Sequence, residues 1–230
     1  MENEAKLTEL NGRLRERYEP YLQFLKNEFS AEADFISLPH LMKVVPSYFN
    51  GKQKILFVGK EFGEWYGNIK DDDKCNVNYL MDIYEQVNLL ETNDEPFWNF
   101  LKSINERING SSTEGFMWTS LSKFNFNEST PPPEVHIRNN RTFDLLRDEI
   151  EILQPDMVFF LTGYSYDEHL RRMYHGIQYK PIKDNVLYKV VHDELPEQTH
   201  IVLHPRALED RGLYDSVKNE ILKEILVLQD

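Results

Sequence analysis

The sequence predicts an α/β fold, because short apolar runs alternate with longer stretches of helical periodicity. Two runs, 54–58 and 156–161, are almost continuously apolar and are followed by Gly59 and Gly163. Such runs are typical of strands buried on both faces of a parallel sheet. The expected fold class is therefore a three-layer α/β/α domain with a central, mainly parallel sheet of about four strands.

The other elements follow from periodicity and from proline. Helices are predicted where apolar residues recur at spacings of three and four, namely over the first thirty residues, 76–91, 95–108, 138–153 and 213–228. Pro20 is expected to break or kink the first of these helices. Shorter strands are predicted over 116–121, 186–191 and 200–203, and a proline-rich loop over 123–135. Because there is no repeat and no long linker, residues 1–230 are interpreted as a single domain with residues 1–50 as an N-terminal helical extension.

Composition narrows the class of protein. The 39 acidic residues exceed the 26 Lys and Arg residues, and the net charge of −13 argues against a general nucleic-acid coat. A local basic strip over 169–189 is interpreted as a solvent-exposed face in preference to a nucleic-acid-binding surface. No apolar run reaches the roughly 20 residues that span a bilayer, and the polar N-terminal stretch is unlike a signal peptide. With Cys75 as the single cysteine, we expect a cytoplasmic protein without a disulfide framework, metal or cofactor.

The first candidate site is the loop 59–67, which directly follows a predicted strand. Ligands of open parallel sheets bind beyond the carboxyl ends of the strands. Three glycines allow close backbone approach, three residues supply charge, and three aromatic rings can stack on a flat ligand. The residues in question are Gly59, Lys60, Glu61, Phe62, Gly63, Glu64, Trp65, Tyr66 and Gly67. The competing interpretation is a glycine-rich turn whose aromatic side chains pack onto the core.

The second candidate site is the loop 204–208, which follows the strand predicted over 200–203. His204, held by Pro205, is placed to donate a hydrogen bond to developing negative charge. Taken alone, a histidine in this position is more often structural. We expect Val58 and Leu203 to end neighbouring or near-neighbouring parallel strands, so that Glu61 and His204 face one cleft.

Four segments together resemble the uracil-DNA glycosylase superfamily. The segment VGKEFG at 58–63 is similar to that superfamily's glycine-led loop, and HPRAL at 204–208 resembles its final histidine-proline loop. Between them, WTSLSKF at 118–124 with NESTPPPE at 127–134, and LQPDMVFFLTG at 153–163, resemble its two intervening motifs in the same order. The resemblance covers about residues 54–220 and implies a DNA base-excision enzyme that hydrolyses the N-glycosidic bond of a modified, uracil-like base.

The resemblance also implies roles for individual residues. Glu61 would be the catalytic carboxylate on the sugar side, and His204 would stabilise the departing base. Leu208 would wedge into the duplex, while Ser120 occupies the position at which an asparagine commonly reads the base edge. Lys60, Phe62, Ser120 and Arg206 depart from the usual residues of these motifs, and each change could alter base specificity while leaving the fold intact.

Two other functions remain open at this point. A non-catalytic protein of the same fold could bind a nucleobase or nucleotide instead of DNA. Alternatively, GYSYD at 163–167 resembles a nucleophile elbow, and Ser165 with Asp193 and His204 would follow the chain order of a serine hydrolase. However, Ser165 followed by Glu168 also fits a helix capping box, which we favour. The sequence does not indicate the oligomeric state.

Overall fold

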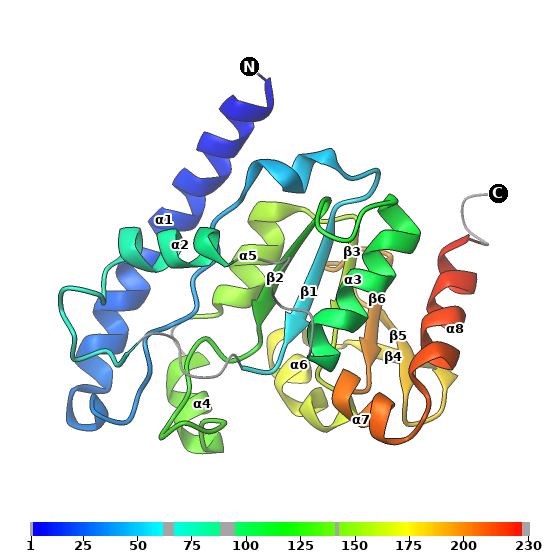
Figure 1. The fold of residues 1–230 in the computed structure, drawn as a ribbon. Helices are drawn as coiled ribbons and strands as arrows, with labels where there is room; N and C mark the ends of the chain where they lie inside the picture. Colours follow the sequence, from blue (N-terminus) through cyan, green and yellow to red (C-terminus); the bar gives the residue numbers. More distant parts are fainter. Residues whose placement is uncertain (1, 62–66, 88–94, 141–142, 227–230) are drawn as a thin grey trace. The chain divides into compact units, whose positions relative to one another are not determined.

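The computed structural model describes residues 2–61, 67–87, 95–140 and 143–226 (Figure 1). Its contacts divide the chain into two units. The first unit contains residues 1–46, 59–87 and 118–153, and the second contains residues 47–58, 88–117 and 154–230. Among the described residues, every helix is too short or too polar to span a lipid bilayer.

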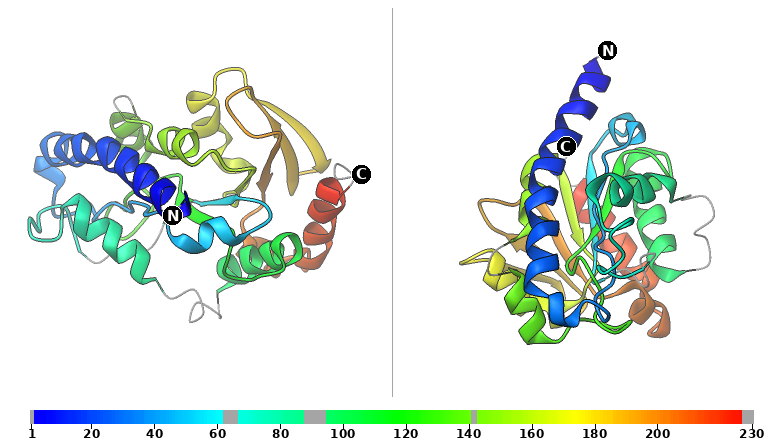
Figure 2. Two further views of the ribbon diagram at one scale, coloured as in Figure 1. Left: turned by 90° about the horizontal axis from the view of Figure 1, so that it is seen from above. Right: turned by 90° about the vertical axis from the view of Figure 1, so that its left-hand side faces the viewer.

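The second unit contains the sheet, apart from Gly59 and the last residues of β2. Its strands are β1 (Ile55–Gly59), β2 (Phe116–Ser120), β3 (Met157–Phe160), β4 (Gln178–Lys183), β5 (Leu187–Val191) and β6 (Gln198–Val202). Its helices are η2 (Pro46–Asn50, at the boundary), α3 (Pro96–Asn109), η3 (Tyr164–Tyr166), α6 (Asp167–Met173), α7 (Pro205–Asp210) and α8 (Tyr214–Leu226). In the view from above, α3 lies beside α8, in agreement with their contacts (Figure 2).

The strand order in the sheet is β2-β1-β3-β6-β5-β4. Strands β1 and β6 both pair with β3 in parallel, with Leu56 opposite Val158 and Val158 opposite Thr199. Strand β5 pairs antiparallel with β6, and β4 pairs antiparallel with β5. The described sheet thus has six strands and is mostly parallel, so the expectation of about four strands is wrong. The strand that the sequence analysis overlooked is β4.

Aromatic rings fill the middle of the sheet. Phe57 of β1 stacks on Phe159 of β3, with ring centroids 5.4 Å apart, and Phe159 stacks on His200 of β6 at 5.5 Å. All three side chains are completely buried. These contacts explain why the apolar runs at 54–58 and 156–161 form neighbouring central strands, since each presents large side chains to both faces of the sheet.

Two glycines allow a close backbone crossing in the second unit. A Cβ atom on Gly115 would lie 2.7 Å from the Cα atom of Gly51 and 2.6 Å from Nδ2 of Asn109. The Asn109 side chain is fixed there because it bonds both the N–H and the carbonyl of Gln53, at 2.9 and 3.0 Å. The backbone of Gly115 also has a left-handed φ of 86°. Both sterics and backbone conformation therefore require glycine at this position.

We expect Gly115→Ala to reduce the free energy of unfolding by about 2–3 kcal/mol, from overpacking and a strained φ. Gly176→Ala is the matched control, because Gly176 has the same φ of 86° but no atom within 4 Å of the position that the added methyl group would occupy. It should cost only about 1 kcal/mol. Urea unfolding of both variants measures the difference, and equal losses would show that the crossing contributes nothing.

The first unit is built around a long N-terminal helix. Its helices are α1 (Glu2–Glu28), η1 (Ser30–Glu32), α2 (Val77–Gln86), α4 (Pro133–Asn140) and α5 (Leu145–Leu153). Helix α1 packs against α5 (Figure 1) and buries a stripe of apolar side chains made by Leu10, Leu14, Tyr18, Leu22 and Leu25. It continues through Pro20, so the expected break there is wrong. Burial of Tyr18, Tyr21 and Leu22 on both sides of the proline keeps the helix continuous.

The helix expected over 138–153 is instead two helices. Helix α4 begins at Pro133, the third of three consecutive prolines, and α5 begins at Leu145. A proline at the first helical position costs little, because that N–H has no partner within the helix. The last three residues of the loop predicted over 123–135 therefore belong to helix α4.

Candidate functional site

The two candidate loops follow strands that end on the same side of the sheet. Strands β1 and β6 are both parallel to β3, which lies between them, so their carboxyl ends point in the same direction. The expectation that Val58 and Leu203 end near-neighbouring parallel strands is confirmed. Glu61 belongs to the first unit and His204 to the second, and a cleft shared by the two side chains stays a prediction.

Glu61 is held by the loop that precedes α4. Its Oε1 atom accepts a hydrogen bond of 2.8 Å from the hydroxyl of Thr130. Its Oε2 atom is buried and has no hydrogen-bond partner among the described residues. The neighbouring Gly59 and Lys60 present their carbonyls to the N–H groups of Leu121 and Ser122, at 2.9 and 2.8 Å. The carboxylate is therefore positioned on one side and keeps acceptor capacity on the other.

Five other residues of this loop, Phe62, Gly63, Glu64, Trp65 and Tyr66, lie outside the described residues. Thr130 was not among the predicted site residues, because it lies 69 residues from its partner Glu61. Its only sequence signal was its position directly before the three prolines, in a segment similar to the superfamily's second motif.

His204 is the N-cap residue of α7. Its Nδ1 atom accepts a hydrogen bond of 3.3 Å from the backbone N–H of Arg206. An imidazole that accepts at Nδ1 carries its proton at Nε2 when it is neutral. Local backbone geometry thus selects the tautomer in which Nε2 is the ring's donor. Such a donor suits the role that the sequence analysis gave to this residue.

Two other residues of the second loop differ in their exposure. Arg206 is exposed and lies 3.7 Å from Glu209, as a surface ion pair between two exposed side chains. Leu208 is completely buried. A residue that inserts between bases must be accessible, and Leu208 instead packs in the core. The wedge role that the resemblance implies for Leu208 is therefore wrong.

Ser120 at the end of β2 is also completely buried. Its hydroxyl lies 3.4 Å from Nδ1 of His40, a histidine outside all the candidate sites. The His40 ring stacks on Trp118 with centroids 4.5 Å apart, and burial holds the pKa of His40 well below its usual range. Ser120 thus belongs to a buried polar cluster around a neutral histidine, and it does not present its hydroxyl to a ligand.

A buried ion pair lies beside this cluster. Lys123 and Glu149 form a salt bridge in which the two side chains are 3% and 0% exposed. The same carboxylate accepts hydrogen bonds of 2.8 Å from the hydroxyls of Tyr18 and Thr119. Helix α1, the end of β2 and α5 are thereby joined through one carboxylate. Because the charge is paired and its oxygens are bonded, burial is tolerated.

Asp144, which directly precedes α5, carries a perturbed carboxyl group. Burial raises the pKa of Asp144 to about 6, against the lowering effect of the Arg147 N–H. A raised folded-state pKa stabilises the protein at acid pH, and this contribution is lost as the pH rises from about 4 to about 6. We expect Asp144→Asn to be more stable than the parent at pH 7, by on the order of 2 kcal/mol.

Thermal or urea unfolding at several pH values between 4 and 7.5 measures this difference. The advantage of the asparagine variant should grow up to about pH 6 and then stay constant. An advantage that is independent of pH would show that the Asp144 carboxyl does not titrate in this range.

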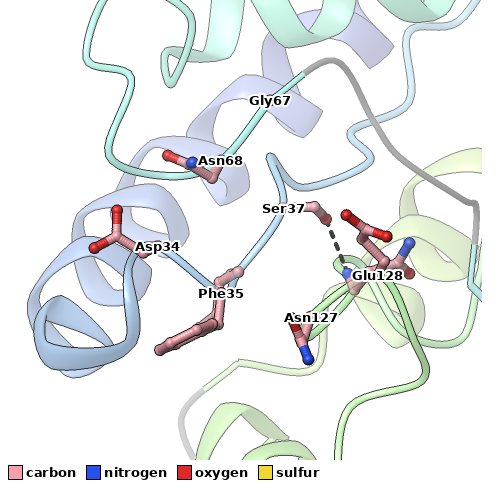
Figure 3. A pocket seen from close by; sticks show the side chains of 9 residues that line it. Asp34, Phe35, Ser37, Gly67, Asn68, Asn127 and Glu128 are labelled. Atoms are coloured by element: carbon pink, nitrogen blue, oxygen red, sulfur yellow. Dashed lines mark hydrogen bonds between the residues drawn. The ribbon is translucent and has the colours of Figure 1, made fainter.

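A cavity of about 460 Å³ opens in the first unit, between the segment 34–37, the turn at 67–68 and the loop 125–128 (Figure 3). The Ser37 side chain points toward the 125–128 loop, where its oxygen accepts the N–H of Asn125 at 2.9 Å. Asn127 and Glu128 both have left-handed backbones, with φ of 50° and 59°. The cavity shares Gly67 with the first candidate loop, and Thr130, which holds Glu61, lies two residues beyond Glu128.

The hydrolase alternative depends on Ser165, whose side chain lies outside what the structure describes. Residue 165 is within η3, and α6 begins only at Asp167 with Tyr166 as its N-cap residue. The expectation that Ser165 is the N-cap residue of that helix is therefore wrong. The short 3-10 turn after Gly163 moves the N-cap by one residue, from Ser165 to Tyr166.

The sequence matches no protein-family model and no curated protein. Within the described part of the chain, no group of three or more His, Cys, Asp or Glu side chains is arranged to hold a metal ion.

Proposed function

We propose that this protein is a DNA glycosylase-like enzyme that hydrolyses the N-glycosidic bond of a modified, uracil-like base. The observation that carries the proposal is the state of His204, whose Nδ1 accepts the Arg206 N–H and whose proton therefore lies at Nε2. Such a donor stabilises the negative charge that grows on a departing base. The three-layer arrangement, a DNA partner and a cytoplasmic location belong to this proposal as well.

Glu61 is proposed to act on the sugar side of the same bond. Breaking a glycosidic bond leaves positive charge on the sugar, which a nearby carboxylate stabilises, and a carboxylate can also orient the attacking water. Thr130 fixes one carboxylate oxygen, and the other oxygen, which is buried, has no hydrogen-bond partner among the described residues. The oxygen of water would then join the sugar, and the base would leave with the proton.

The test is incubation with single- and double-stranded oligonucleotides that each carry one deaminated or alkylated base. Released base is measured by mass spectrometry against the same reaction without protein. Release of at least one base supports the proposal, whereas release of none contradicts it. In that case the net charge of −13 favours the second candidate, a non-catalytic protein that binds a nucleobase or nucleotide without a DNA backbone.

A further inference from the structure

An exposed tyrosine follows strand β3 beside the loop that carries His204. The N–H of Gly163 donates to the carbonyl of Val202 at 2.9 Å, and a Cβ atom on Gly163 would lie 3.7 Å from the backbone nitrogen of His204. The turn after β3 therefore lies against the start of α7 within the second unit, and α6 and α7 follow at the same end of the sheet (Figure 1). Tyr164 is the next residue in this turn and is 41% exposed. Its ring is thus placed at the carboxyl ends of the parallel strands, where ligands of such sheets bind.

Two further tyrosines support the Tyr164 ring. Tyr188 of β5 packs beside it with ring centroids 5.0 Å apart and an interplanar angle of 30°. Tyr179 of β4 meets it edge to face, at 5.5 Å and 76°. The Tyr188 hydroxyl accepts the N–H of Asn185 at 2.7 Å, which fixes that ring. We call these three rings the tyrosine shelf; Tyr179 and Tyr188 are half-buried, and Tyr164 is its exposed member.

Arg171 of α6 holds the tyrosine shelf from the helix side. Its guanidinium lies 4.9 Å from the centroid of the Tyr179 ring and donates to the Asp167 carboxylate at 2.6 Å. Hydrogen bonds with Asp167 and Tyr164 raise the pKa of Arg171. Contacts within the protein therefore set the position of the Tyr164 ring before any ligand arrives. A ring held in this way can bind a flat partner at a low cost in conformational entropy.

Stacking, and not charge, is the recognition that the tyrosine shelf offers. The bases of the strip over 169–189 do not gather around it, because Tyr179 and Lys180 are successive residues of β4 and point to opposite faces of the sheet. Lys180 lies opposite Lys189, and Lys189 lies opposite His200, whose ring belongs to the stack on the other face. Attraction to phosphate is therefore weak at the shelf, and a planar ring is the chemistry that it fits.

We propose that Tyr164 stacks on a nucleobase that binds beside His204. The choice of a nucleobase rests on the proposed function, in which His204 donates from Nε2 to a departing base. Stacking tolerates every base, because each has a π face. Tyr164 would therefore hold the substrate in position, while groups that contact the base edge would select which base is bound.

The test is a fluorescence titration with 2-aminopurine riboside 5′-monophosphate, whose emission falls when its base stacks on an aromatic ring. We expect the parent protein to quench this emission. Tyr164→Leu keeps an apolar side chain against the other two tyrosines but removes the π face, and it should weaken binding about five- to fiftyfold. Tyr164→Phe should retain the quenching and bind within about threefold of the parent, because stacking uses the ring and not the hydroxyl.

Val191→Ala is the surface control. Val191 is also exposed, at 36%, but it is the last residue of β5, which runs antiparallel to β6, so it lies toward the amino end of β6. This variant should bind like the parent, and thermal unfolding shows that each variant is folded. Unchanged affinity in a folded Tyr164→Leu variant would overturn the proposal. Equal losses in Tyr164→Leu and Tyr164→Phe, or in Tyr164→Leu and Val191→Ala, would overturn it as well.

A second probe distinguishes a free nucleotide from a nucleic-acid strand as the source of the base. A short single-stranded oligodeoxynucleotide with a fluorescein label is titrated by anisotropy with the same variants. Tighter binding of the strand would assign the tyrosine shelf to nucleic acid, and tighter binding of the monophosphate would assign it to a free nucleotide. Both outcomes support the proposal when they depend on Tyr164, whereas binding of neither probe by the parent would overturn it.

The binding measurements are independent of cleavage, so the two proposals can fail separately. Base release by the parent together with unchanged affinity in Tyr164→Leu would reject the stacking role alone. Binding that depends on Tyr164 without release of any base would support the stacking role and reject only the hydrolysis.

Discussion

Glu149→Gln should reduce the free energy of unfolding by about 3–5 kcal/mol, because it leaves Lys123 as an uncompensated buried charge. Glutamine keeps the shape of the side chain and an oxygen for the Tyr18 hydroxyl, so the loss reports mainly on charge. Burial already lowers the pKa of Lys123. Without its partner Lys123 can release its proton more easily, and the destabilisation should therefore be smaller at pH 9 than at pH 6.

Urea unfolding at both pH values measures these effects. The double variant Lys123→Met/Glu149→Gln should recover most of the loss, because it removes both charges. Lys26→Ala provides the surface comparison, since Lys26 pairs with Asp72 at 2.8 Å where Asp72 is 86% exposed, and it should cost less than about 1 kcal/mol. A double variant that is no more stable than Glu149→Gln would contradict this account of the pair.

Loss of either proposed catalytic group should lower single-turnover base release by about 10²–10³-fold. For the carboxylate the change is Glu61→Gln, which removes charge and keeps the size. For the histidine we prefer His204→Asn to His204→Ala, because asparagine is a good N-cap residue and can still accept the Arg206 N–H. Binding of the oligonucleotide should remain largely intact, and Glu61→Gln should bind slightly more tightly because one repulsion with phosphate disappears.

Matched controls make the same chemical changes elsewhere. Glu9→Gln and His175→Ala each alter an exposed residue outside the two candidate loops and should keep parental turnover. Single-turnover cleavage and a binding titration at fixed salt, on the base identified by the panel, give both readouts. Full activity in both Glu61→Gln and His204→Asn would refute the mechanism.

Much of the sheet was predictable because its central strands have one chemical signature. The runs at 54–58 and 156–161 are apolar on both faces, and burial on both faces is what the structure shows for β1 and β3. Strand β4 escaped prediction for the opposite reason. It is an edge strand that carries Lys180, Pro181 and Lys183, and its side chains are exposed or half-buried. Lysine and proline protect sheet edges from further pairing, and in a sequence they resemble a loop.

The candidate loops could be found because each directly follows a strand, whereas the cavity could not. Its lining comes from three segments, 34–37, 67–68 and 125–128, and no local spacing brings them together. The partnership of Lys123 with Glu149 is likewise hidden, since one residue was assigned to a loop and the other to a helix 26 positions later. A sign of the cavity was present in Asn127, because asparagine tolerates the left-handed backbone that the 125–128 loop needs.

The division of the chain into two interleaved units has a consequence for synthesis on the ribosome. The chain passes from one unit to the other five times, after residues 46, 58, 87, 117 and 153. Tyr18 is made early, but its acceptor Glu149 follows 131 residues later, which at cellular translation rates is a delay of roughly 7–26 s. During that time the apolar stripe of α1 has no α5 to cover it. We expect the nascent chain to need a chaperone that shields this helix until α5 is complete.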